Sequence, residues 1–196
     1  MSDMAGNTTE MVRSRPITAD EYHRMGETGI LRPDERVELL NGRIVEMPPI
    51  GHRHSYGVIA LDALLQRTFD DPAVIVAQGP IRLDRFSEPQ PDLLIVRGPI
   101  DRYATRHATP DDTLLVVEVA ESTLRYDRGE KLRAYARMGI AEYWIVDVAR
   151  ERLHAFTEPD GERYRTESVV EREGRIAPRA FPDDLIALDD ILVPRR

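Results

Sequence analysis

A helical segment between two apolar strands constrains the fold of this chain more than any other feature. The runs 113–119 and 142–147 are rich in β-branched and aromatic residues and predict strands. Between them, the four residues from Asp127 to Glu130 match a capping box, and Gly139 is typical of a helix end. Two strands joined through a helix usually run parallel in one sheet. The sequence therefore predicts an α/β fold in which 142–147 pairs in parallel with an earlier strand.

A second signal lies near the N-terminus. Asn41-Gly42, the dipeptide most typical of a tight hairpin turn, separates the apolar-rich runs 36–40 and 43–47. We therefore expect an N-terminal β-hairpin. The other predicted elements are helices at 18–26 (from a capping box) and 52–69, strands at 73–77, 81–83, 92–96, 152–156 and 163–170, and an apolar segment at 185–192.

Composition excludes several classes of function. The 196 residues contain no cysteine, which excludes disulfides, thiolate metal sites and cysteine nucleophiles. No apolar run approaches the ~20 residues that a membrane span requires, and we expect a cytoplasmic protein with no membrane partner. The net charge of −8 argues against a fixed basic surface for nucleic acid. Because no linker divides the chain, we predict a disordered tail at 1–15 and a single domain at 16–196.

Two acidic residues lie at the ends of neighbouring predicted strands. Asp92 begins the strand 92–96, and Glu118 nearly ends the next one. We expect these strands to pair antiparallel with Val96 opposite Leu114. In that register Asp92 lies opposite Glu118, with Cβ atoms ~4.5–5.5 Å apart. Two carboxylates this close repel unless a cation such as Mg²⁺ lies between them. The simpler alternative is that both are strand-end residues in solvent.

Lys131 is the only lysine among 27 basic residues, all the others being arginine. It lies in the first turns of the predicted helix, within reach of the two carboxylates. A compact amine there can stabilise charge on a transferring phosphoryl group or help to deprotonate a water. The alternative is a surface ion pair with Asp127 at i, i+4, worth only ~0.3–0.5 kcal/mol.

Four ordered blocks of the sequence, 37–47, 90–96, 115–119 and 126–147, resemble the Uma-type putative restriction endonuclease family of the PD-(D/E)XK nuclease superfamily. The resemblance extends over roughly 16–192. It implies a restriction-endonuclease-like α/β core, with a mixed β-sheet flanked by helices, and a Mg²⁺-dependent phosphodiesterase site that can also use Mn²⁺.

The resemblance also implies roles for individual residues. Asp92 matches the Asp of the Pro-Asp element and Glu118 the second acidic position, and both would be metal ligands. The lysine is displaced from the superfamily's simplest pattern, because Ala120 stands two residues after Glu118. The family usually supplies it from the following helix, which here is Lys131.

Three further residues are implied as site residues. Glu38 matches an acidic position of the family's opening motif, and the alternative for it is ordinary strand polarity. His54 and Gln78 fall where the family carries polar residues that point toward the site. His52 and His54 do not predict a zinc pair, because residues two apart on a helix do not face each other.

These observations predict a metal-dependent DNA endonuclease. The acidic net charge predicts weak or partner-assisted DNA binding, and a homodimer is expected to ease that difficulty. The alternative is a catalytically silent protein with a nuclease fold that acts as a binding or regulatory module. Cleavage of RNA or of branched DNA would use the same site.

Overall fold

The computed structural model describes residues 14–69 and 73–195. Its centre is a six-stranded sheet with the strand order β3-β4-β5-β6-β7-β8. The strands are β3 (Ala73–Ala77), β4 (Leu93–Arg97), β5 (Thr113–Ala120), β6 (Glu142–Asp147), β7 (Arg152–Asp160) and β8 (Arg163–Glu171). The pair β5 and β6 is parallel and every other pair in this sheet is antiparallel. The mixed α/β sheet predicted from the sequence is confirmed.

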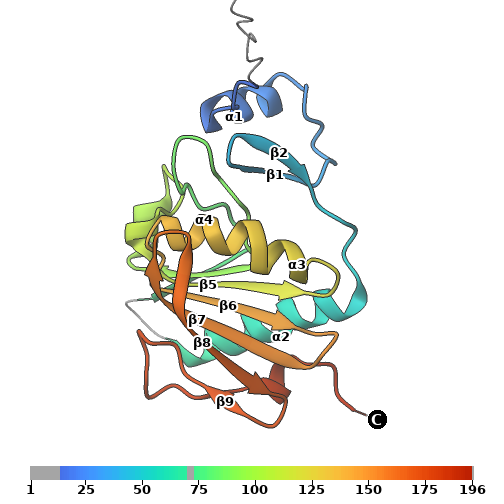
Figure 1. Cartoon of the computed structure of the whole chain (residues 1–196), viewed down its shortest axis with the longest axis vertical. Coiled ribbons are helices and arrows are strands. Elements are labelled where there is room, and N and C mark those ends of the chain that lie inside the picture. The colour runs from blue at the N-terminus through green and yellow to red at the C-terminus, as the bar shows by residue number, and fades with distance from the viewer. Residues whose placement is uncertain (1–13, 70–72, 196) are drawn as a thin grey trace, which may run out of the picture.

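Helices cover both faces of this sheet (Figure 1). The helix α2 (His52–Thr68) lies on one face. The other face carries a helical segment made of α3 (Leu124–Tyr126), a π-helical turn (Asp127–Lys131) and α4 (Leu132–Arg137). Its end at Gly139, which has a φ of 73°, is as predicted.

Alternate residues of the central strands point into two separate cores. Val117 and Trp144 pack on the α2 side, whereas Val116 and Tyr143 pack on the α4 side. All four side chains are fully buried or nearly so. A sheet covered on both faces explains why these strands have continuous apolar runs instead of alternating polarity.

An N-terminal unit lies beside the sheet, near α4 (Figure 1). It consists of α1 (Ala19–Glu27), which begins with the predicted capping box at Thr18, and a hairpin of β1 (Val37–Leu40) and β2 (Arg43–Glu46). The predicted turn residues have the left-handed conformation that a type I′ turn requires, with φ of 52° at Asn41 and 71° at Gly42.

A C-terminal segment closes the α2 side of the molecule. The short strands β9 (Arg175–Ile176) and β10 (Ile186–Ala187) pair with each other. A 3₁₀-helix at Leu188–Ile191 then packs against α2, and its apolar side chains join the same core. Two further 3₁₀-helices, Ile100–Tyr103 and Pro110–Asp112, lie within the long loop before β5.

Three local predictions are wrong. The segment 81–83 is not a strand, because Ile81 forms only an isolated bridge with Ala108. The helix after β5 begins at Leu124 instead of Asp127, since the preceding Thr123 hydroxyl donates to the Asp127 carboxylate over 2.6 Å. A bulge shifts the register of β4 on β5, so Val96 faces Thr113 and not Leu114.

The tail predicted at 1–15 lies outside the described residues, except for its last two positions. Of these, Arg15 is exposed and pairs with Glu21 over 2.7 Å. Over the ranges 14–69 and 73–195, no helix combines the length and the apolar character needed to cross a membrane.

Candidate active site

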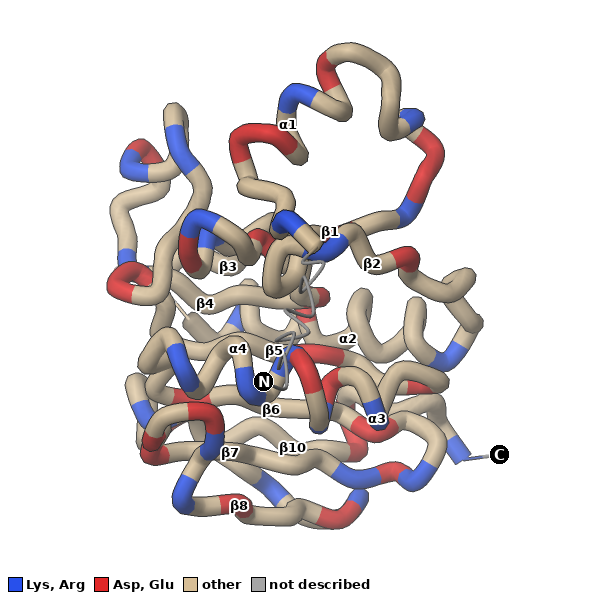
Figure 2. Tube along the Cα trace, turned by 45° about the horizontal axis from the view of Figure 1, so that its top comes forward, with Lys and Arg blue, Asp and Glu red and all other residues tan. Residues whose placement is uncertain are grey.

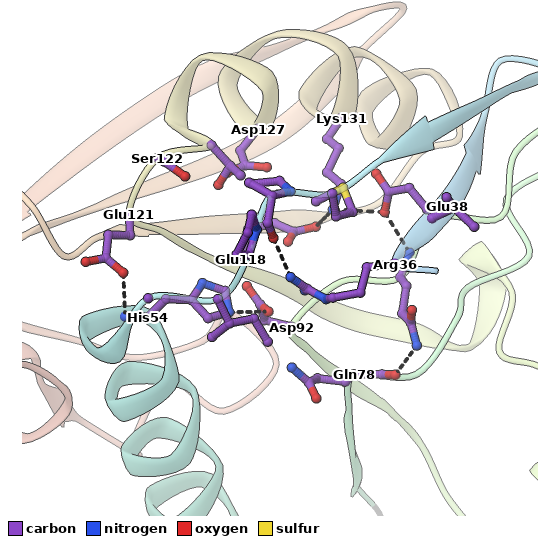
Figure 3. A pocket seen from close by; sticks show the side chains of 18 of the residues that line it. Arg36, Glu38, His54, Gln78, Asp92, Glu118, Glu121, Ser122, Asp127 and Lys131 are labelled. Carbon is purple, nitrogen blue, oxygen red and sulfur yellow. Dashed lines mark hydrogen bonds and ion pairs between the residues drawn. The ribbon is translucent and has the colours of Figure 1, made fainter. Parts of the chain in front are cut away.

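A cavity of about 490 Å³ lies where the hairpin, the first turn of α2 and the π-helical turn meet the ends of β4 and β5. It is drawn in Figure 3. All six site residues predicted from the sequence line this cavity: Glu38, His54, Gln78, Asp92, Glu118 and Lys131. They come from six different segments of the chain, and the fold brings them together.

The pairing of β4 with β5 places Asp92 and Glu118 at the cavity. Leu93 faces Val117 and Leu94 faces Val116, which is the predicted register up to the bulge. Asp92 lies just before the first residue of β4, and its Oδ2 accepts a hydrogen bond from the Val119 amide over 2.8 Å. The two carboxyl groups therefore belong to one site and are not separate strand-end residues in solvent.

Lys131 is fully buried beneath this site. Its Nζ lies 2.8 Å from Glu118 Oε1 and 3.2 Å from Glu38 Oε2. The alternative of a surface ion pair is therefore wrong. Burial alone would lower the pKa of Lys131, but the carboxylates around it, Glu118 first, raise that pKa well above its ordinary value. The amine stays protonated.

Glu118 is held by two buried donors. Lys131 and the Tyr135 hydroxyl, at 3.0 Å, both donate to Oε1. Its other oxygen, Oε2, accepts no hydrogen bond from the part of the chain that the structure describes. Burial raises the pKa of Glu118 well above its ordinary value, and the charge of Lys131 opposes this shift. One carboxylate oxygen thus remains available to a ligand in the cavity.

The hairpin supplies Glu38, which is also buried. One oxygen accepts from the Tyr126 hydroxyl over 2.9 Å, and the other accepts from the Gln90 amide over 3.1 Å. Lys131 also contacts the second oxygen. Both carboxylate oxygens of Glu38 are therefore occupied by protein partners. This residue positions Lys131 and ties the hairpin to the sheet.

The π-helical turn brings Asp127 to the cavity together with Lys131. The extra residue in such a turn changes which side chains face the sheet, and π turns are frequent at functional sites. Asp127 is 1% exposed. Burial raises its pKa to about 6, against the opposing effects of Lys131 and the Thr123 hydroxyl.

His54 stands between the backbone of β5 and the Asp92 carboxylate. Its Nδ1 lies 2.6 Å from the Val119 carbonyl oxygen, which can only accept, so Nδ1 carries a proton. Its Nε2 is buried, forms no well-aligned hydrogen bond with any described residue, and lies 3.1 Å from Asp92 Oδ1. The carboxylate raises the pKa of His54, and burial opposes that shift. The pair is suited to a proton or a cation between Nε2 and Oδ1.

Gln78 shapes the edge of the cavity through its backbone. It has a left-handed φ of 49°, its amide donates to the Asp92 carbonyl oxygen over 2.8 Å, and its own carbonyl oxygen accepts from the Gln90 side chain over 2.6 Å. These bonds fix the segment that presents Asp92. The Gln78 side chain is exposed and lines the opening (Figure 3).

Sequence reasoning missed Tyr126, Asp127 and Tyr135 as parts of the site. The signal that could have found two of them is spacing: Asp127, Lys131 and Tyr135 recur every four residues, and positions i and i+4 share one helix face. The cavity also carries six acidic side chains against one arginine and one lysine, which favours a bound cation.

Comparisons with known proteins identify the family and the fold of this chain. The family model of Uma2, described as "Putative restriction endonuclease", matches residues 19–189. Among solved structures, the chain is similar to a putative nuclease belonging to DUF820 from Anabaena variabilis, with a TM-score of 0.69 at 14% identity. That similarity covers 90% of this chain and 97% of the other, and it shows the fold. No curated protein matches the sequence significantly.

Proposed function

The chain belongs to the Uma2 family of putative restriction endonucleases, and from this premise we propose that it is a Mg²⁺-dependent endonuclease that hydrolyses DNA phosphodiester bonds. The observation that carries the proposal is the buried Lys131 ammonium, held between Glu118 and Glu38 at a cavity that Asp92 also lines. A buried cation with two acidic partners costs desolvation energy that a purely structural role does not require.

The residues present fit a divalent cation. Asp92 Oδ2 and Glu118 Oε1 accept hydrogen bonds from the protein. The ligands would be Glu118 Oε2 and Asp92 Oδ1, the oxygen that faces His54 Nε2 at 3.1 Å. Mg²⁺ typically takes one or two protein carboxylates and completes its shell with waters and phosphate oxygens. Mn²⁺ is expected to substitute. When bound, such an ion polarises a phosphoryl oxygen and lowers the pKa of a coordinated water.

The side chains then have separate tasks. Lys131 keeps its proton, so it supports catalysis by stabilising the negative charge that develops on the phosphoryl group and not by removing a proton from water. Glu38 positions Lys131, and the Tyr135 hydroxyl positions Glu118. His54 orients Asp92 from the α2 side.

DNA binding by a single chain is expected to be weak. The net charge is −8, and Figure 2 shows Lys and Arg interspersed with Asp and Glu along the trace. Since duplex affinity comes mainly from neutralised phosphates, we propose that a homodimer or a separate DNA-binding partner supplies the missing affinity.

The proposal is tested by incubating plasmid, single-stranded DNA and RNA with the full chain and Mg²⁺ or Mn²⁺. We expect DNA cleavage that falls by about 10²–10³-fold in Asp92→Asn and in Glu118→Gln. Glu162→Gln, which changes an exposed carboxylate in the β7–β8 turn, is the matched control and should cleave like the parent.

Three outcomes contradict the proposal. Cleavage that survives both site substitutions excludes this cavity as its source. Cleavage of RNA alone overturns the DNA assignment. No cleavage of any substrate, together with no Mn²⁺ binding at millimolar concentration, favours the catalytically silent module. Circular dichroism of each variant separates these outcomes from misfolding.

A further inference from the structure

A second cluster of potential metal ligands lies outside the catalytic cavity. Among the described residues, His23, Glu88 and His107 are the one group of three whose donor atoms all lie within 4.8 Å of one another. None of the three lines the cavity. His23 belongs to α1, Glu88 to the segment before β4, and His107 to the long loop before β5. We propose that these three side chains bind a divalent transition-metal ion such as Zn²⁺.

The ligand types select this class of ion. Two imidazoles and one carboxylate suit Zn²⁺ and its neighbours, whereas Mg²⁺ prefers oxygen ligands alone. The cation that binds at Asp92 and Glu118 and the cation that binds here are therefore of different chemical classes. The three protein ligands leave a fourth tetrahedral position for water.

The geometry needs only small adjustments. His23 Nε2 and Glu88 Oε1 are in direct contact at 2.5 Å, so they must separate by less than 1 Å to share an ion, and the rings of His23 and His107 have centroids 5.8 Å apart. Ligands of one Zn²⁺ at ~2.0–2.1 Å are about 3.3 Å apart in a tetrahedron. His107 is exposed, so its ring can rotate to close the remaining distance without disturbing packed residues.

Glu88 is positioned as a metal ligand usually is. Its side chain is only 3% exposed, and Arg82 Nε donates to Oε2, which leaves Oε1 directed at His23. Arg82 is in turn held by Asp20 over 3.2 Å. Partners of this kind, which orient a ligand from behind, are typical of protein metal sites.

A metal ion here would join three segments that support the catalytic cavity. The Glu88 amide donates to the Leu39 carbonyl oxygen over 2.8 Å, and Leu39 follows Glu38 in the hairpin. The Ala19 amide donates to the Arg85 carbonyl oxygen over 2.8 Å, which fixes the start of α1 to the same segment. Zn²⁺ would thus stabilise the N-terminal unit without taking part in the reaction.

The test is Zn²⁺ titration of the chelator-treated full chain in competition with a chromogenic indicator, with thermal unfolding as a second readout. We expect one Zn²⁺ per chain and a raised melting temperature. His107→Ala, which alters an exposed side chain, should weaken Zn²⁺ binding by more than about tenfold and remove the temperature shift. His52→Ala, which changes an exposed histidine on α2, is the matched control and should bind normally.

Asp92→Asn separates this site from the catalytic cavity, and Zn²⁺ binding should survive it. Equal affinity of the parent and His107→Ala overturns the inference, as does loss of Zn²⁺ binding in Asp92→Asn. Absence of any Zn²⁺ binding tighter than the indicator's range also overturns it. Because none of these readouts is nuclease activity, failure here leaves the proposed function untouched.

Discussion

The two faces of the central sheet carry different kinds of core. On the α2 face, β5 and β6 contribute Val117, Val119 and Trp144 to a cluster of apolar side chains. On the α4 face, the same strand β5 contributes Glu118, which meets Lys131 in a buried ion pair. Apolar residues of β5 such as Val116 also pack on the α4 face, but only there does the strand add a buried charge. Burying an ion pair generally costs desolvation energy that an apolar replacement often avoids, so the α4 face is expected to be the less stable arrangement.

The largest expected effect comes from removing the buried cation. Lys131→Met leaves Glu118 and Glu38 buried without their partner, and we expect the free energy of unfolding to fall by about 3–5 kcal/mol. Urea denaturation measures this loss. Lys131→Arg keeps the charge but not the compact amine, so it should recover part of the stability and little of the cleavage. A Lys131→Met variant as stable as the parent would show that the buried carboxylates of Glu118 and Glu38 do not need the lysine as their partner.

The apolar face should respond differently. Leu65→Ala on α2 removes a fully buried side chain, and an unfolding free energy lower by about 2–4 kcal/mol is expected. Because Leu65 lies on the face opposite Glu118, nuclease activity per folded molecule should stay unchanged. Activity assayed well below the melting temperature checks this. A selective loss of activity would show that the two faces are coupled.

A smaller effect concerns pH. Asp127 has its pKa raised from 3.8 to about 6 in the folded protein, so the folded state binds this proton more tightly than the unfolded chain. Its contribution to stability is therefore full below about pH 4 and is lost as the pH rises through 6. The free energy of unfolding should fall by about 3 kcal/mol in all, since one pKa unit corresponds to ~1.36 kcal/mol. The unfolding free energy of the parent should therefore fall between pH 4 and 7, and this fall should be absent in Asp127→Asn. An equal fall in both proteins would contradict the raised pKa of Asp127.

Much of the fold could be predicted because local signals agree with the tertiary structure. The Asn41-Gly42 turn, the Thr18 capping box and the parallel pairing of β5 with β6 all follow from short-range patterns. The errors occur where a tertiary contact overrides such a pattern. The residues from Asp127 to Glu130 resemble a helix start. In the structure Asp127 lies within the helical segment and accepts a hydrogen bond from the Thr123 hydroxyl, whereas Glu130 pairs with Arg43 of the hairpin.

Most charged members of the candidate site could be predicted from the sequence, but Asp127 and the two tyrosines could not. Asp92, Glu118 and Lys131 stood out by strand register and by the rarity of lysine in the chain. Tyr126 and Tyr135 did not, because a tyrosine at helical spacing is usually a core residue. Only the coordinates show that their hydroxyls donate to Glu38 and Glu118.

The hairpin that carries Glu38 forms a sheet of its own, since β1 and β2 pair with each other and not with a strand of the central sheet. Local unfolding of this hairpin would separate Glu38 from Lys131 while the six-stranded sheet stayed folded. Such partial opening requires less free energy than global unfolding. We therefore expect the proposed cleavage activity to be lost at a temperature where the circular dichroism of the bulk protein is still native.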